Sequence, residues 1–294
     1  MTKVDANGGY SRPFKLGKLP AQPARPKLRF ASIAAQLTAP PKSSDWISGV
    51  ESWPMYGNDR YGDCVEAEMG HHIEQISRFG QGTTAQVTPD AVLGAYSAIT
   101  GFDPAEPGTD RGTVIEDALS WWRKGQGLAG HAIVAYASVD VSSATEVKQA
   151  VSLFGGLSVG FNFPASAMAQ FNAGQPWDVV RGSRLEGGHC VLVGGYDAQY
   201  FTCVTWGAVQ RMTPAFWRHY VDEAWVVIND EMAGHLSRYG IGLHALGEEF
   251  ASLTGQANPF PGADPGPGPA NVTAGEVASV ARSALDEALK GLGL

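Results

Sequence analysis

Helical spacing of apolar residues dominates the first half of this chain, and strand patterns dominate the second half. The segments with helical spacing are residues 63–79, 89–100 and 112–124, followed by a short one at 144–154. Thr88-Pro89 and Gly101 are typical start and stop signals for the second of these helices. The strand-like runs are residues 131–141, 157–163, 188–196, 200–206 and 223–228. This order predicts an α+β fold.

The composition is that of a globular chain without an export signal. With 294 residues, of which 44% are hydrophobic and 17% charged, the chain can bury a sizeable core. It has no run approaching the roughly 18 to 20 apolar residues of a membrane span, and it begins with polar residues rather than a signal peptide. Three cysteines without CxxC spacing favour free thiols in a reducing compartment. We therefore expect a cytoplasmic or virion-associated protein without membrane contact, metal or cofactor.

A basic N-terminal arm precedes an acidic body. Residues 1–45 contain eight Lys and Arg against two Asp, whereas the rest of the chain contains 13 against 27 Asp and Glu. An acidic body excludes nonspecific nucleic-acid binding, which needs clustered cations. The arm is rich in proline and is predicted to be extended chain. An inhibitory pro-segment, a tether to a partner and an unordered tail are all compatible with this composition.

The C-terminal end forms a separate unit beyond a linker. Residues 255–270 are rich in Pro and Gly and cannot form a helix or a strand. Residues 271–294 predict an amphipathic helix that begins with a capping box at Thr273 and Glu276. A lone helix of this length is marginal in water, so its apolar stripe is expected to dock on the body, a sister subunit or another protein. Residues 46–254 lie between arm and linker as one domain.

Cys64 and His189 are the candidate nucleophile and base. Cys64 opens a predicted helix, and His189 opens an apolar strand 125 residues later. The positive end of a helix lowers the pKa of a cysteine there and favours its thiolate, which a neighbouring histidine activates further. The alternative interpretation makes Cys64 a small buried apolar residue and His189 a structural hydrogen-bonding group. Cys190 and Cys203 are predicted to be reduced core residues.

Four sequence blocks resemble the papain-like cysteine peptidases and occur in that family's order. They are residues 58–64 at the nucleophile, 111–125 with a glycine-led helix, 146–159 before the histidine strand, and 188–191 with 205–207 at the histidine. The resemblance covers about residues 50–230. A narrower likeness at residues 53–58 and 212–217 is to papain-like proteins encoded by actinobacterial phages.

The resemblance implies both an architecture and a site. The expected fold is a helical half whose nucleophile helix packs on an antiparallel sheet or half-barrel that carries the histidine. Cys64 and His189 take the catalytic positions, and Asn58 stands where the family has its oxyanion glutamine. Gly112 corresponds to a position that offers backbone hydrogen bonds to an extended peptide. Trp206 corresponds to a tryptophan that shields the histidine and its orienting residue from water.

The residue that orients His189 departs from the family's asparagine. Counting back from Trp206 puts Val204 at this position, and valine accepts no hydrogen bond. Counting across a hairpin with Tyr196 opposite Tyr200 puts Thr205 nearest His189. Threonine can accept a hydrogen bond from the imidazole, although more weakly than an amide. The sequence therefore favours Thr205 over a site without an orienting residue.

Three functions fit these residues. The first is a papain-like cysteine peptidase or amidase, a thiol protease with a catalytic dyad acting on a peptide, a protein or a peptidoglycan amide. The second is a catalytically weak or inactive papain-like structural protein, such as a phage virion component, attached to partners or to itself through its two tails. The third is an acyl transferase on the same fold.

Glu68, His71 and His72 are interpreted as a solvated helix face rather than a metal site.

Overall fold

The computed structural model describes residues 14–25, 27–31, 39–125 and 127–229, together with the separate residues 248, 251, 257 and 258. The predicted C-terminal helix at 271–294 lies outside the described residues, as do the first 13 residues of the arm and most of the 255–270 linker. Within the described ranges, no helix has the length and apolar character needed to cross a membrane.

The described chain contains helices, one 3-10 turn and strands in a mixed order. The helices are α2 (Cys64–Gln81), α3 (Pro89–Thr100), α4 (Ile115–Trp122), α5 (Ala144–Phe154), α6 (Ala165–Asn172) and α7 (Pro214–Tyr220), with the turn η1 at Pro107–Thr109. The strands are β1 (Ser44–Asp45), β2 (Ala135–Ser138), β3 (Leu157–Pro164), β4 (Leu185–Tyr196), β5 (Phe201–Thr205), β6 (Ala208–Met212) and β7 (Val221–Ile228).

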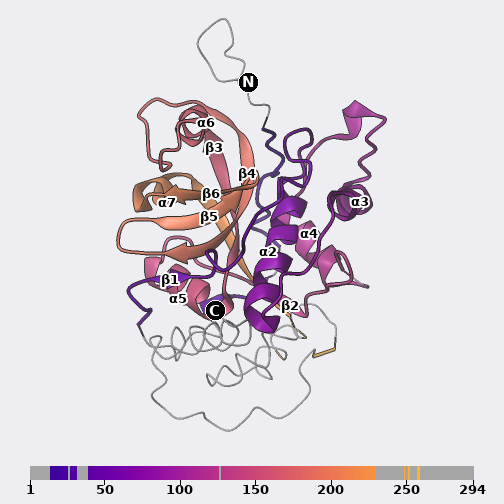
Figure 1. The fold of residues 1–294 in the computed structure, drawn as a ribbon, viewed down its shortest axis with the longest axis horizontal. Helices are drawn as coiled ribbons and strands as arrows, with labels where there is room; N and C mark the ends of the chain where they lie inside the picture. The colour runs from indigo at the N-terminus through magenta and orange to yellow at the C-terminus, as the bar shows by residue number, and fades with distance from the viewer. Residues whose placement is uncertain are drawn as a thin grey trace, which may run out of the picture.

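These elements form two halves, as Figure 1 shows: α2, α3 and α4 lie on one side, and β3 to β6 with α5, α6 and α7 lie on the other, while β2 lies near the lower end of α2 in this view. All strand pairs are antiparallel, in the order β2-β7-β3-β4-β5-β6, and the short β1 adds to β4. The helix α2 packs against β4 and β5, and α5 packs against β4 and β7. The predicted α+β arrangement, with the helix that begins at Cys64 packed on an antiparallel sheet, is confirmed.

The strand β4 has helices on both sides, which explains its nearly continuous apolar sequence. Val191 and Val193 belong to the core that includes residues of α5 and α7. Cys190 belongs to the core around α2, α3 and α4, and Leu192 to a third, smaller cluster. Cys190 and Cys203 are buried free thiols, as predicted.

The helix α2 is the central element of the helical half and is buried on nearly all sides. Every residue from Cys64 to Ser77 is buried, so the prediction of a solvated face at Glu68, His71 and His72 is wrong. Pairing of polar groups makes this burial tolerable. Glu68 binds Nδ1 of His72 at 3.1 Å and the hydroxyl of Ser158 at 2.8 Å, and Nε2 of His71 lies 2.7 Å from the carbonyl oxygen of Pro54.

Capping residues set the ends of α3 as the sequence predicts, and a capping serine also marks the start of α5. Thr88 accepts a hydrogen bond from the N–H of Ala91, Pro89 is the first residue of α3, and Gly101 ends the helix in the left-handed conformation. Ser143 accepts a hydrogen bond from the N–H of Glu146 at the start of α5. Local hydrogen bonding therefore fixes where both helices begin.

The hairpin of β4 and β5 has a different register at its tip from the one predicted. Tyr196 pairs with Phe201 rather than Tyr200, because the turn is four residues long and Asp197 binds the N–H groups of Gln199 and Tyr200. An irregularity between Val193 and Gly195 then shifts the pairing by one residue. Beyond it, Val193 pairs with Cys203, as the predicted count requires.

The sequence patterns missed β6 and overextended β2. In β6 the apolar Val209 is exposed while the polar Gln210 is buried and donates to the carbonyl oxygen of Gln175 at 2.9 Å. This reverses the usual alternation of a strand with one buried face. The strand predicted at residues 131–141 is reduced to Ala135–Ser138 in β2.

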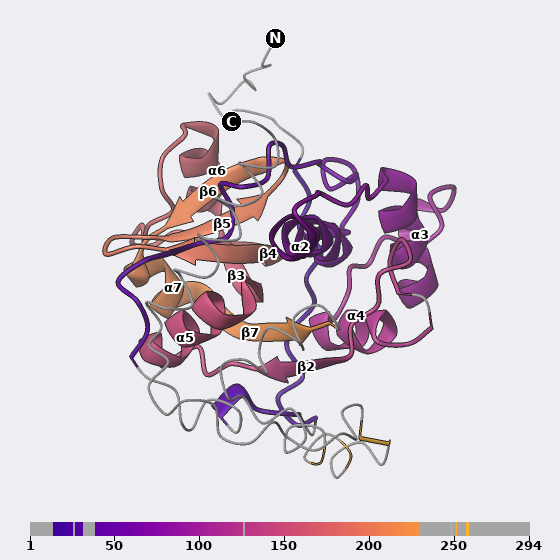
Figure 2. The same cartoon turned by 60° about the horizontal axis from the view of Figure 1, so that its bottom comes forward.

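The N-terminal arm runs between the two halves. In Figure 2 its indigo trace passes between α2 and α4 on one side and the sheet on the other. An isolated parallel bridge joins Lys18 to Thr113, and another joins Arg29 to Ser138 of β2. Residues 14–25 are therefore part of the folded body, although the sequence predicts a separate arm over residues 1–45.

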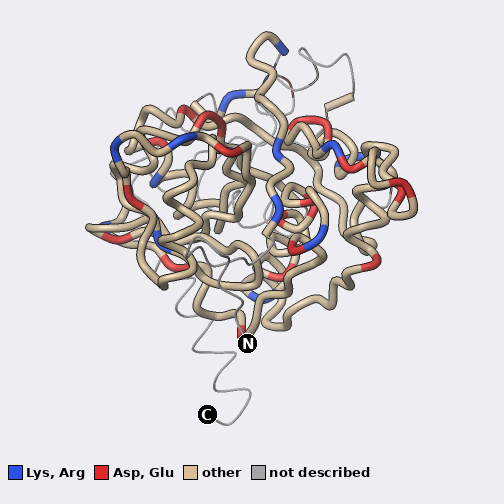
Figure 3. The backbone as a smooth tube through the Cα atoms, turned by 90° about the horizontal axis from the view of Figure 1, so that it is seen from above, with Lys and Arg blue, Asp and Glu red and all other residues tan. Residues whose placement is uncertain are grey.

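Charges of both signs are distributed around the molecule. Figure 3 shows Lys and Arg interspersed with Asp and Glu over the described chain, without a face of one sign in that view. Cations of the arm meet acids of the body: Lys18 pairs with Asp222 and Glu223, and Arg25 pairs with Asp117. Some of the positive charges of the arm are thus neutralised by acidic residues of the body.

Candidate active site

Cys64 lies at the first residue of α2, where the helix leaves its first N–H groups without intrahelical partners. Cys64 is 1% exposed, and the backbones of Cys190 in β4 and of Gly17 in the arm approach its thiol closely enough to lower its pKa. Burial raises the pKa of this thiol to about 12, and the two backbone contacts only partly offset that effect. In this closed arrangement Cys64 is a neutral thiol at physiological pH.

His189 lies in β4 and directly precedes Cys190, whose backbone is close to the Cys64 thiol. Its Nε2 is 2.7 Å from Oγ1 of Thr205, the last residue of β5. Its Nδ1 is buried and has no hydrogen-bond partner within the described residues. Burial lowers the pKa of His189 to about 3, so the imidazole is neutral. One ring nitrogen is held by Thr205, and the other is free for a reacting group.

The contact predicted between Thr205 and His189 is confirmed, and Val204 does not take that place. Val204 instead packs with Ile47, Leu192 and other residues of the third core cluster. Because side chains alternate along β5, the two neighbours face opposite sides of the strand.

Trp206 shields His189, as the sequence predicts, and a tight turn aims its ring. The indole stacks on the imidazole with ring centroids 4.3 Å apart and planes 19° apart. Trp206 and Gly207 have φ values of 47° and 70°, and they connect β5 to β6 in the type of two-residue turn that suits hairpins. A non-glycine residue with positive φ costs roughly 1 kcal/mol. This conformation places the indole ring of Trp206 over the imidazole of His189.

Asn58 is buried near the start of α2, with its amide engaged in its own loop. Nδ2 donates to the carbonyl oxygen of Tyr61 and to Oδ1 of Asp63, both at 3.1 Å. Both amide hydrogens are therefore used, whereas the sequence analysis expects the amide to face the reaction cavity. An oxyanion role for Asn58 requires the release of one of these bonds.

Gly112 is beside the arm, but the following residue makes the backbone hydrogen bonds. The N–H of Gly112 donates to the hydroxyl of Tyr96 at 2.9 Å. The N–H of Thr113 donates to the carbonyl oxygen of Gly17 at 2.8 Å, and its carbonyl oxygen accepts from Leu19 at 2.9 Å. The backbone hydrogen bonds expected at Gly112 are thus made by Thr113, and their partner is the arm.

The first described residues of the arm cover His189 and its neighbours. Phe14 stacks on Trp206 with centroids 4.9 Å apart, and the indole N–H of Trp206 donates to the carbonyl oxygen of Lys15 at 3.3 Å. The N–H of Lys15 donates to the carbonyl oxygen of Asn58 at 2.9 Å. The next residues continue between the halves, where Lys18 donates its N–H to the carbonyl oxygen of Gly188 at 3.1 Å.

Glycines allow the arm to approach the site closely. A Cβ atom on Gly17 would lie 1.7 Å from the carbonyl oxygen of Gly62, which is far inside van der Waals contact. A Cβ on Gly112 would lie 2.0 Å from the carbonyl oxygen of Gly17, and one on Gly188 would lie 2.2 Å from that of Lys18. The path of the arm therefore depends on glycine at position 17 of the arm and on glycine at positions 112 and 188 of the segments beside it. The composition of the arm indicates extended chain and does not reveal this junction.

Two buried carboxyl groups flank Cys64 and were not identified from the sequence. Oε1 of Glu66 accepts from the hydroxyl of Thr113 at 2.7 Å, and burial raises the pKa of Glu66 to about 8. Burial also raises the pKa of Asp63, an effect that its bond from Asn58 reduces. No group of three or more His, Cys, Asp and Glu residues with metal-binding geometry occurs within the part of the chain that the structure describes.

Comparison with known proteins identifies the fold. No family model matches the chain, and the curated proteins include no match in sequence. Xylellain, a cysteine protease from Xylella fastidiosa, is similar in structure with a TM-score of 0.56 at 16% identity, covering 75% of this chain and 98% of its own. Digestive procathepsin L 3 of Tenebrio molitor larval midgut has a TM-score of 0.51 at 14% identity, covering 74% of this chain and 76% of its own. The chain therefore has the papain-like fold.

Proposed function

We propose that this protein is a papain-like cysteine peptidase or amidase with Cys64 as nucleophile and His189 as base. The observation that carries the proposal is that the two ring nitrogens of His189 have different environments. Nε2 is 2.7 Å from Oγ1 of Thr205, and the buried Nδ1 has no hydrogen-bond partner in the described chain. When Thr205 accepts from Nε2–H, the lone pair of Nδ1 is available to a thiol. Cys64 supplies that thiol from the helix packed on the same strand.

In the proposed reaction, Nδ1 of His189 takes the proton of the Cys64 thiol, and the sulfur attacks the carbonyl carbon of the substrate. The backbone N–H of Cys64, at the positive end of α2, stabilises the oxyanion. Protonated His189 then gives its proton to the leaving amine, and water hydrolyses the thioester to free Cys64. The Asn58 amide contributes to the oxyanion hole only after it exchanges a loop hydrogen bond.

The arm keeps this site in a closed form. Gly17 is in contact with the thiol, and burial favours the neutral forms of both Cys64 and His189. Displacement of residues 14–25 admits water and a substrate, which removes the main cause of both pKa shifts. Of the roles left open for the arm, we propose inhibition, because a tether would not need to cross the nucleophile.

The test is cleavage of a fluorogenic peptide library by the full chain with Gly17→Ala, a change that displaces the arm. We expect hydrolysis that is abolished by adding Cys64→Ala or His189→Ala and retained with Cys203→Ser, which changes a buried cysteine elsewhere. If Cys64→Ala cleaves the library as well as the Gly17→Ala parent, the assignment of the nucleophile is wrong.

A catalytically inactive structural protein is the second candidate, and the commitment of both Asn58 amide hydrogens to the loop favours it. In that case the chain serves as a packing module, for example in a phage particle, attached through its tails. Absence of hydrolysis in the opened variant, together with a Cys64 that iodoacetamide still does not modify, would support this candidate over the enzyme.

A further inference from the structure

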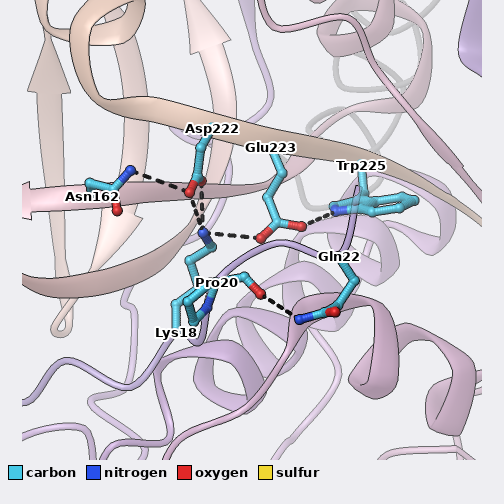
Figure 4. Close-up of polar contacts among 7 residues, drawn as sticks. All are labelled: Lys18, Pro20, Gln22, Asn162, Asp222, Glu223 and Trp225. Carbon is cyan, nitrogen blue, oxygen red and sulfur yellow. Dashed lines mark hydrogen bonds and ion pairs between the residues drawn. The ribbon is translucent and has the colours of Figure 1, made fainter. Parts of the chain in front are cut away.

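An acidic pocket beside the site holds the side chain of Lys18. Nζ of Lys18 is 2.7 Å from both carboxylate oxygens of Asp222 and 3.1 Å from Oε1 of Glu223, as Figure 4 shows. The other oxygen of Glu223 accepts from the indole N–H of Trp225 at 2.9 Å, which fixes this carboxylate. The Lys18 side chain is only 1% exposed.

The walls of the pocket fit the aliphatic part of a lysine. A Cβ on Gly160 of β3 would lie 2.4 Å from Cε of Lys18 and 2.9 Å from Cδ1 of Ile115 in α4. The same atom would lie 2.8 Å from Cγ of Glu223. A glycine thus opens a channel between β3, α4 and β7, with an apolar wall along the stem and two carboxylates at the ammonium. This shape and charge recognise a long cationic side chain.

The carboxylate of Glu223 requires a cation when the pocket is closed, because its side chain is 8% exposed, whereas that of Asp222 is 29% exposed. Removing the partner of a buried charge leaves it uncompensated and is strongly unfavourable. Gly17, the residue before Lys18, contacts the Cys64 thiol, so a chain in this position presents its next side chain directly to the pocket. The acidic residues belong to the body and the lysine belongs to the arm. Once the arm leaves, the pocket is open to a basic residue of another peptide.

We infer that Asp222 and Glu223 form a specificity subsite for a lysine side chain of the peptide substrate, and that Lys18 of the arm occupies this subsite in the closed form. The inference rests on the proposed function, because only an enzyme has a peptide substrate. The binding of a lysine peptide does not depend on turnover. The favoured ligand is a peptide with lysine next to the residue that lies at Cys64. Peptides with a neutral or acidic residue at that position should bind poorly.

A binding experiment tests the subsite without requiring catalysis. The full chain with Lys18→Gln is treated with iodoacetamide in the presence of acetyl-Leu-Gly-Lys-Leu-amide, which copies residues 16–19. We expect this peptide to slow labelling of Cys64 with an affinity at least about tenfold better than its Lys-to-Gln counterpart, equivalent to ~1.4 kcal/mol. Equal protection by the two peptides would overturn the inference, and because both are measured on one protein, folding does not enter.

Variants of the pocket and the arm provide the controls. Adding Asp222→Asn and Glu223→Gln should remove the preference for the lysine peptide. If the chain with both substitutions does not fold, Asp222→Asn alone is the milder variant. Lys18→Gln should raise the labelling rate of Cys64 in the absence of peptide. The matched change Lys15→Gln, at an exposed lysine of the same arm, should leave the rate unchanged. An equal rise with Lys15→Gln would show a general charge effect and contradict the subsite.

Turnover separates this inference from the proposed function. In the opened Lys18→Gln chain, hydrolysis of peptides in which one lysine is moved along the sequence should peak at a single position and lose that peak with Asp222→Asn and Glu223→Gln. Protection by the lysine peptide without hydrolysis would retain the subsite and reject the peptidase. Hydrolysis without any dependence on lysine would retain the peptidase and reject the subsite.

Discussion

At the residue scale, the orientation of His189 depends on the hydroxyl of Thr205. Thr205→Val keeps the shape but leaves Nε2 buried without its partner at 2.7 Å. A hydrogen bond to a group that becomes charged contributes about 1.5 to 3 kcal/mol, so we expect kcat of the opened enzyme to fall by about 10- to 100-fold. Thr205→Ser should retain most of the activity. The pH profile of Cys64 alkylation provides a readout that a loss of stability alone would not change.

The same strand offers a matched control in Thr202, which pairs with Gly195, six residues along β4 from His189. Thr202→Val makes the same chemical change in β5 and should alter neither kcat nor the pH profile. If Thr205→Val behaves like Thr202→Val, the hydroxyl has no part in orienting the imidazole.

Glu66 should make the stability of the fold depend on pH. Burial raises its pKa from the usual 4.5 to about 8, so the folded chain holds a proton that the unfolded chain releases. Its contribution to stability is fully present below pH 4.5 and is lost as pH rises toward 8. Glu66→Gln keeps an acceptor for Thr113 and should stabilise the fold at pH 9 by a few kcal/mol. Urea unfolding at pH 5 and pH 9 measures this, and an equal effect at both values would contradict it.

At the scale of elements, the seating of the arm depends on Gly17. A Cβ there would lie 1.7 Å from the backbone of Gly62, so Gly17→Ala should displace the arm while leaving the body folded. We expect the Cys64 labelling rate at neutral pH to rise at least about tenfold, because exposure lowers the pKa of the thiol. Gly108→Ala is the control, since no atom lies within 4 Å of its Cβ position. An unchanged rate with Gly17→Ala would show that the arm does not close the site.

Local patterns predicted elements well where the signals are local, as at Thr88 and Pro89, where α3 begins. They also predicted the contact of Thr205 with His189, because the irregularity near Gly194 cancelled the one-residue error at the turn. The path of the arm could not be predicted, since it depends on glycines far apart in the chain meeting in space. The exposed Val209 and buried Gln210 likewise reflect tertiary contacts that reverse the local pattern.

At the scale of the whole molecule, the buried residues of the core clusters within the described chain lie between Leu28 and Ile228. They come from both halves and a short part of the N-terminal region, and Phe14 and Leu16 of the arm pack against the first cluster. The site, the arm and the acidic pocket lie in the same body.

Removing residues 271–294 should leave the body folded and change its association. A short amphipathic helix gains too little from its own contacts to offset an ordering cost of about 1 to 2 kcal/mol per residue, so its apolar stripe needs a surface. We expect the truncated chain to keep the melting temperature and Cys64 labelling rate of the full chain while losing self-association or partner binding, measured by sedimentation and pull-down. A full-length variant with Leu285→Glu is the matched control, because it spoils the stripe without shortening the chain. If truncation unfolds the body, the segment belongs to the core, and attachment through the C-terminal helix is wrong.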